Sequence, residues 1–252
     1  MHFDVAADAY DRYMGAWSRQ LSPGLVAFAG IRPGHHVLDV GCGPGALTEE
    51  LLATVGDGSV SAVDPSEAFV AAARARYPGV DVRRATAEAL PFPDDAFDAA
   101  LAQLVVHFMA DPVAGLREMA RVTRRGGVVV ACVWDFGGDR GPLGPFWEAA
   151  RATDPSVVDE SHLAGTRDGH LVELFEAAGL TDVANGVLRA SRTYADFDDW
   201  WTPFTQGVGP GGAYVAGLDP ARQATLRDRC RSMLPDGPIV LTAYAWVARG
   251  TA

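Results

Sequence analysis

The first part of the chain alternates short apolar runs with amphipathic segments. The runs are rich in Val, Ala and Leu and too short for buried helices, as expected for strands covered on both faces. Between them, apolar residues recur at helical spacing. We expect an α/β fold with a parallel sheet, with strands at 35–40, 59–63, 80–84, 97–102 and 128–134 and helices at 46–55, 67–77 and 112–122.

The later part of the chain continues the sheet and adds an insertion. An amphipathic helix is predicted at 168–178, where Gly179 ends it, and further strands are predicted at 181–190 and 239–247. The segment 194–238 between these strands is too long for a hairpin loop. We interpret it as a cap over a substrate site, with a helix at 220–234.

The N-terminal segment and the cap complete a single predicted domain. Two short helices, 3–17 and 24–29, are expected before the first strand, separated by a break at Ser22-Pro23. No repeat or linker divides the chain. The prediction is therefore one domain, 1–252, with lid helices in 1–30, a core of about 30–135, 168–192 and 238–249, and a cap of about 193–237.

Composition and charge narrow the class of ligand. The chain has 252 residues, 48% apolar and 21% charged, which is ordinary for a soluble protein with an ample core. Its formal charge of −11 disfavours nucleic acid and anionic membranes as partners, so a small or uncharged substrate fits better. Three scattered cysteines predict a reducing, cytoplasmic setting. No export signal and no apolar stretch approaching about 18 residues is found, so neither export nor a membrane span is expected.

A glycine-rich loop follows the first strand. Asp39 precedes Gly41, Gly43 and Gly45, and an amphipathic helix begins at once. Such a junction brings backbone N–H groups to the edge of a parallel sheet, although an ordinary strand-to-helix turn looks similar. A dinucleotide fold would show G-x-G-x-x-G instead. The string D-V-G-C-G-P-G resembles motif I of the class I S-adenosylmethionine (SAM) methyltransferases, which implies SAM as the cofactor.

An acid stands at the end of the second strand. Asp64, followed by Pro65, lies about twenty residues beyond the glycine loop, where a carboxylate can accept hydrogen bonds from both ribose hydroxyls. The alternative is an N-cap for the helix that begins at Glu67, a role that Ser66 could also fill. Its spacing from the glycine loop favours the ribose interpretation.

A second motif extends the resemblance. The string A-E-A-L-P-F, which contains Ala87 and Glu88, resembles the adenine-side loop of ubiquinone/menaquinone-biosynthesis methyltransferases; Thr86 stands where many relatives carry an acid. With Gln103 at the end of the fourth strand, the resemblance covers about the first 135 residues. It implies a Rossmann-like sheet of seven mostly parallel strands with helices on both faces, its seventh strand antiparallel between the fifth and the sixth, plus a helical, aromatic cap.

Catalytic and acceptor-binding residues are less sharply indicated. His107 is a candidate general base for an oxygen nucleophile, although a buried helix histidine is an equal alternative; His162 and His170 are weaker candidates. No spacing of His and acids predicts a metal site. Aromatic residues are expected either to line the cofactor and acceptor sites or to pack in the core: Tyr10 beside the cofactor, and Trp17, Trp134, Trp200, Trp201 and Phe204 around the acceptor.

The sequence therefore predicts a cytoplasmic SAM-dependent methyltransferase for a small-molecule acceptor. The acceptor and the oligomeric state are not predicted. Two alternatives stay open: a SAM-binding module that regulates without transfer, and a dinucleotide-dependent oxidoreductase, which the G-x-G-x-G spacing disfavours.

Overall fold

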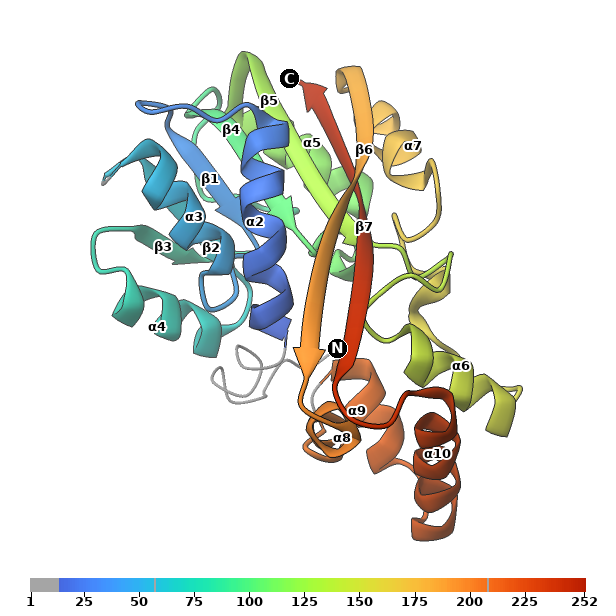
Figure 1. Ribbon diagram of the computed structural model, residues 1–252. Coiled ribbons are helices and arrows are strands. Elements are labelled where there is room, and N and C mark those ends of the chain that lie inside the picture. Colours follow the sequence, from blue (N-terminus) through green and yellow to red (C-terminus); the bar gives the residue numbers. More distant parts are fainter. Residues whose placement is uncertain (1–13, 57, 208) are drawn as a thin grey trace.

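A seven-stranded sheet forms the centre of the molecule (Figure 1). The computed structural model describes residues 14–56, 58–207 and 209–252. Strands β1 to β5 are parallel, and β7 pairs antiparallel with β5 and β6, in the order β3-β2-β1-β4-β5-β7-β6. The predicted fold class is confirmed. The strands are β1 Val37–Val40, β2 Val60–Asp64, β3 Asp81–Arg84, β4 Phe97–Gln103, β5 Thr123–Trp134, β6 Thr181–Tyr194 and β7 Ile239–Thr251.

Helices cover both faces of the sheet, which explains the apolar strands. Successive strand residues point to opposite faces and enter different cores: Ala99 and Leu101 pack with the helices on one face, Ala100 and Ala102 with those on the other. The first face carries α2 Ala16–Ala29, α3 Ala46–Val55 and α4 Glu67–Arg76, and the second carries α5 Pro112–Val122 and α7 His170–Ala177.

The strand order brings the predicted cofactor residues to one edge. The chain leaves β1 toward β2 on one side, while β4 pairs with β1 on the other, so a crevice forms where the order reverses. Asp39 pairs with Ala62 of β2 and with Leu101 of β4. The loops that follow β1, β2 and β4 therefore meet at the carboxyl edge of the sheet.

The expected break at Ser22-Pro23 is wrong, because α2 runs through it as one helix. Leu21 and Leu25, on either side of the proline, are both buried against the sheet, and this packing outweighs the loss of one backbone hydrogen bond. The helix ends at Gly30, whose left-handed backbone (φ 70°) caps it. Tyr10 and most of the first predicted helix lie outside the described residues.

The last two strands are longer than predicted. β6 and β7 pair from Thr181↔Thr251 to Tyr194↔Ile239 and form a hairpin that extends beyond the rest of the sheet (Figure 1). At its far end lie three helices of the insertion, α8 Phe197–Thr205, α9 Gly209–Ala216 and α10 Pro220–Met233, with α10 against α6 Gly144–Thr153. The described helices include none long and apolar enough to cross a membrane. The described residues also form two short 3-10 turns, η2 Val106–Phe108 and η3 Glu160–His162.

Candidate functional site

A cavity lies at the carboxyl edge of β1, β2 and β4. Its walls come from the glycine loop, the end of β2, the end of β4 and the first turn of α2, which contributes Gly15 and Ser18. The structure thus brings together most of the predicted cofactor residues. Those that line this cavity are Asp39, Gly41, Gly43, Asp64, Pro65 and Gln103.

The glycine loop requires glycine at two positions. Gly41 and Gly45 have φ angles of 73° and 99°, in the left-handed region. A Cβ at Gly41 would lie 2.5 Å from Cγ2 of Val105, and one at Gly45 would lie 2.4 Å from Cε2 of Tyr77. The N–H groups of Gly41 and Cys42 donate to the carbonyl of Val63, which fixes the loop against β2. The loop can therefore approach a ligand closely with its backbone.

Asp64 fixes the glycine loop and the start of α4 in relation to each other. Its Oδ2 accepts from the N–H of Gly43 at 2.9 Å and its Oδ1 from the N–H of Ser66 at 2.8 Å. The helix is capped by Ser66, whose Oγ accepts from the N–H of Phe69 at 3.4 Å, so the N-cap alternative for Asp64 is wrong. Burial raises the pKa of this carboxyl, while the two N–H donors lower it. The carboxylate is pre-oriented at the cavity wall.

Asp39 is the second acid of the cavity and is almost fully buried. Its Oδ2 accepts a hydrogen bond from Oγ1 of Thr48 at 2.6 Å. Burial raises the pKa of Asp39 to about 7, and the neighbouring Asp64 adds to the rise, while the Thr48 hydroxyl opposes it. A carboxyl in this state gains a proton readily and is stabilised as the anion by a cation in the cavity.

A second cavity lies beside the first, along the A-E-A-L-P-F loop. It is lined by residues 85–88 of that loop and by 108–110, and it shares Gly41, Pro65, Val105 and Phe108 with the first cavity. Ala87 lies in its wall. Glu88 uses one carboxylate oxygen to accept from the N–H groups of Ala110 and Asp111, at 2.8 and 3.3 Å. Glu88 therefore joins the two loops that border this cavity, which the motif did not indicate.

The matches to known proteins fit this geometry. The family model described as "Methyltransferase domain" matches residues 38–131, which include the glycine loop, Asp64 and Gln103. An uncharacterized protein of Mycobacterium tuberculosis (strain ATCC 25618 / H37Rv) is 32% identical over 244 residues, covering 91% of this chain and 86% of that protein. The chain belongs to the class I SAM-dependent methyltransferases. Its cofactor is S-adenosylmethionine.

Named relatives of this methyltransferase match just under half of its length. The ubiquinone/menaquinone biosynthesis C-methyltransferase UbiE of Bdellovibrio bacteriovorus is 38% identical over 117 residues, which are 45% of this chain and 49% of that protein. The demethylmenaquinone methyltransferase of Mycobacterium sp. (strain KMS) is 42% identical over 118 residues, covering 46% and 47% of the two chains. The chain thus spans about half the length of these two relatives.

Solved structures share the fold. Phosphoethanolamine N-methyltransferase 2 of Haemonchus contortus, with S-adenosylhomocysteine bound, superposes with a TM-score of 0.61 at 16% identity, over 99% of this chain and 58% of that one. A geranyl diphosphate methyltransferase in complex with SAM gives a TM-score of 0.55 at 15% identity, over 100% and 92%. At these identities the similarity supports the fold and leaves the acceptor open.

His107 of the methyltransferase lies in η2 and is buried between aromatic rings. Its ring centroid is 3.9 Å from that of Phe108 and 6.0 Å from that of Phe136. Burial lowers the pKa of His107 to about 3, so the imidazole is neutral at physiological pH. No atom of the described residues lies within hydrogen-bonding distance of its buried Nδ1. The buried-histidine alternative therefore describes this residue better than the general-base role.

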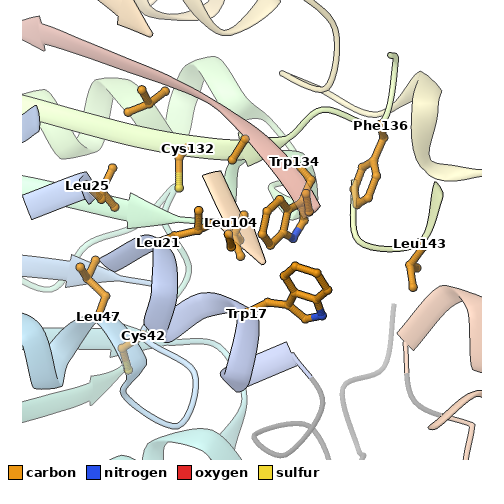
Figure 2. Close-up of a cluster of buried hydrophobic side chains, with 14 of the residues drawn as sticks. Trp17, Leu21, Leu25, Cys42, Leu47, Leu104, Cys132, Trp134, Phe136 and Leu143 are labelled. Atoms are coloured by element: carbon orange, nitrogen blue, oxygen red, sulfur yellow. The ribbon is translucent and has the colours of Figure 1, made fainter. Parts of the chain in front are cut away.

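The predicted aromatic residues form two separate groups. Trp17 of α2 and Trp134 at the end of β5 meet edge to face in the core, with ring centroids 6.1 Å apart (Figure 2). Neither ring lines the cofactor cavity, although Ser18, the residue after Trp17, does. The other three belong to α8 and pack among themselves and against α6; Phe204 stacks on Phe146 at 4.4 Å. The rings of Trp200, Trp201 and Phe204 are thus part of the core between insertion and domain, which is the packing alternative.

Sequence reasoning missed one buried acid in this region. Glu160, in η3, is 6% exposed and accepts a hydrogen bond from Nε1 of Trp147 at 3.1 Å. Burial raises its pKa to about 7; the Trp147 donor lowers it and Asp159 raises it. Glu160 stands in a loop without regular spacing, so no pattern could have indicated its burial. Across the described part of the chain, no three His, Cys, Asp or Glu side chains are grouped as metal ligands.

Proposed function

We propose that this methyltransferase transfers the methyl group of SAM to a small-molecule acceptor. The observation that carries the proposal is the pair of neighbouring cavities at the carboxyl edge of the sheet, which share four lining residues, with a pre-oriented Asp64 between the glycine loop and the adenine-side loop. Two adjoining cavities with a mixed lining suit a nucleoside ligand with one polar end. When bound, the cofactor supplies an electrophilic methyl group.

The described residues fit distinct parts of that cofactor. Asp64 would hold the ribose hydroxyls, because its carboxylate is already fixed by two backbone donors. Pro65, Ala87 and Phe108 offer the apolar contacts that an adenine ring requires. Asp39 would face the cationic amino-acid end, since its carboxyl lies in the cavity wall beside Gln103.

A small acceptor is supported by charge and by the insertion. The net charge of −11 works against binding a nucleic acid. Trp17 and Trp134 are fully buried, and Trp17 is next in the sequence to Ser18 of the cofactor cavity, so the core beside this part of the cavity is apolar and water-poor, which favours methyl transfer. A relative named demethylmenaquinone methyltransferase also acts on a small molecule. We propose that the acceptor binds at the Ser18 side of the cavity, with Trp17 and Trp134 as its apolar support.

The proposed chemistry needs no protein base. His107 is neutral and buried, and a neutral amine or an already ionised oxygen or carbon nucleophile needs only to be positioned. This chain's residues would then orient the acceptor and exclude water. The identity of the methylated atom follows from the acceptor itself.

The test begins with binding and ends with product. Titration calorimetry with SAM, S-adenosylhomocysteine and NAD is expected to give micromolar binding of the first two, lost in Asp64→Ala, and none of NAD. The protein is then incubated with trideuteromethyl-SAM and a panel containing a phenol, a quinol, a primary amine and a carboxylate. Mass spectrometry should find the label in a small molecule. Label that enters only added protein or RNA would overturn the proposed acceptor class, while the binding result would stand.

A further inference from the structure

Gln103 connects the cofactor cavity to α2. It is the last residue of β4, is 9% exposed and lines the cavity. Its Nε2 donates to the carbonyl of Ser18 at 3.1 Å, and its Oε1 accepts from Oγ of Ser22 at 3.1 Å. Both atoms of the amide are thus used on α2, and Ser18 itself lines the cavity. The place of Gln103 at the end of a parallel strand predicted that it lies at the cofactor and did not indicate these bonds.

Ser22 brings three elements together at the same point. Its Oγ lies 3.0 Å from the carbonyl of Ser18, 3.1 Å from Oε1 of Gln103 and 3.4 Å from the carbonyl of Ala46, the first residue of α3. The side chain is almost fully buried. The next residue, Pro23, has no N–H and removes one hydrogen bond from the helix. The side-chain hydrogen bonds of Ser22 therefore lie next to the place where α2 lacks a backbone hydrogen bond.

Apolar packing already holds α2 on the sheet. Trp17, Leu21 and Leu25 are buried along one side of the helix and face Leu104, Cys132 and Trp134 (Figure 2). Burial of such side chains contributes about 1.5–3 kcal/mol each, so α2 does not depend on Gln103 for attachment. The amide instead acts on the turn that carries Gly15 and Ser18, which form the α2 wall of the cavity.

We infer that Gln103 is a positioning residue that sets the α2 wall of the cofactor cavity by holding the carbonyl of Ser18. It acts on the cofactor through α2. The inference rests on the cofactor site of the proposed function and adds that the affinity for the cofactor depends on the polar contact between β4 and α2. A merely structural role would affect folding without a selective loss of binding.

The test compares two glutamines that both tie α2 to the sheet. Oε1 of Gln20 accepts from the N–H of Ser191 on β6, away from the cavity, so Gln20→Ala is the matched control. In Gln103→Ala, S-adenosylhomocysteine affinity measured by calorimetry should fall at least tenfold, with little change in the melting temperature. Ser22→Ala should give a smaller loss in the same direction. Gln20→Ala should leave the affinity unchanged.

Gln103→Glu tests the donor to Ser18 directly. A protonated carboxyl can donate to the Ser18 carbonyl and accept from Ser22, as the amide does, whereas a carboxylate repels that carbonyl. The affinity of this variant, as a ratio to the wild type at each pH, should recover on going from pH 8.5 to pH 5.5. The ratio is required because Asp39 of β1, whose pKa burial raises to about 7, titrates in this range in both proteins and lines the same cavity. Burial also raises the pKa values of the other titratable groups of the cavity, Asp64 of β2 and Cys42 of the glycine loop.

The possible results separate the roles. If Gln103→Glu binds S-adenosylhomocysteine weakly at both pH values, the inference is overturned, because a direct contact between Gln103 and the cofactor would then explain the loss of affinity. Parallel losses of melting temperature and affinity in Gln103→Ala and Gln20→Ala would also overturn it and assign a purely structural role. If the wild type fails to bind S-adenosylhomocysteine, the proposed function fails, which is a different result.

Discussion

Two halves of this methyltransferase are built by different kinds of interaction. The cofactor half consists of the glycine loop and the strand ends around the cavity; the insertion half consists of α8 to α10 together with α6 and η3. In the cofactor half, backbone N–H groups, glycines with positive φ and short acids define the cavity, as at Gly41, Gly45 and Asp64. In the insertion half, rings pack on rings, as with Phe146 and Phe204. The first arrangement tolerates few residue types at each position, and the second accepts many. The comparison teaches that one half constrains the ligand and the other constrains the shape around it.

The largest expected effect separates stability from binding. Trp200, in the ring cluster of α8, is 1% exposed, and Trp200→Ala should lower the free energy of unfolding by about 3–5 kcal/mol. The affinity for S-adenosylhomocysteine below the melting transition should be unchanged, since the ring lies in the insertion core. Urea unfolding and calorimetry measure the two quantities. A large loss of affinity in folded Trp200→Ala would contradict this prediction and would mean that the insertion half also determines cofactor binding.

The next variant should act on the cofactor half. Gly45→Ala combines a left-handed φ of 99° with a Cβ 2.4 Å from the ring of Tyr77. Backbone strain of this kind costs about 1–3 kcal/mol, and the displaced loop should weaken cofactor binding at least tenfold. Gly34→Ala is the matched control, because its φ of 85° is equally strained but no atom lies within 4 Å. Gly34→Ala should lower the stability without changing the affinity. The double variant Gly45→Ala/Tyr77→Ala should bind the cofactor more tightly than Gly45→Ala, because the clash with the Tyr77 ring is removed.

Two buried acids, one in each half, predict a shared dependence on pH. Burial raises the pKa of Asp39 and of Glu160 to about 7, above the unfolded values of 3.8 and 4.5. Folded protein therefore binds protons at these two groups that unfolded protein releases. Their contribution to stability is fully present below about pH 4 and is lost as pH rises to about 7. Glu160→Gln should remove about 2 kcal/mol of the decline between pH 5.5 and pH 7.5, as measured by urea unfolding at these two pH values.

The same pair of acids should differ in their effect on the ligand. Asp39→Asn is expected to flatten the pH dependence of S-adenosylhomocysteine binding, because its carboxyl lies in the cavity wall. Glu160→Gln should leave that dependence unchanged. Equal effects of both variants on binding would contradict the separation of the two halves.

The smallest effect is expected at the surface of the insertion. Arg227 of α10 contacts Oδ1 of Asp198 on α8 at 2.7 Å, and both side chains are well exposed. Exposed pairs contribute about 0.2–1 kcal/mol, so Arg227→Ala should shift the melting temperature little, and less still at high salt. A large shift would mean that the stacking of Arg227 on Phe197 contributes more than the ion pair.

Sequence reasoning succeeded where backbone geometry requires particular residues. The glycine loop and the place of Asp64 at a strand end follow from spacing and alternation, and the order of the strands was implied by the resemblance to class I methyltransferases; the structure has the loop, the acid and the strand order where they were expected. It failed at Pro23, where tertiary packing of α2 overrides a helix breaker. It left two roles open for His107, because the burial of this residue depends on Phe108 and Phe136 from two segments. Contacts of this kind have no period along the chain. The bonds of Gln103 and Glu88 were missed for the same reason.

The position of β7 bears on how the chain folds during synthesis. β7 is the last strand of the sequence, yet it lies between β5 and β6 and provides the sheet partner of β6 along its whole length. The backbone of Ala252 also bonds to Gly126 and Gly127 at the start of β5. While a nascent chain emerges from the ribosome, the edge of β6 therefore has no strand partner until residues 239–251 have been synthesised. A chaperone that binds the chain during that interval would affect the insertion of β7 between β5 and β6. A tag joined after Ala252 would affect the same step.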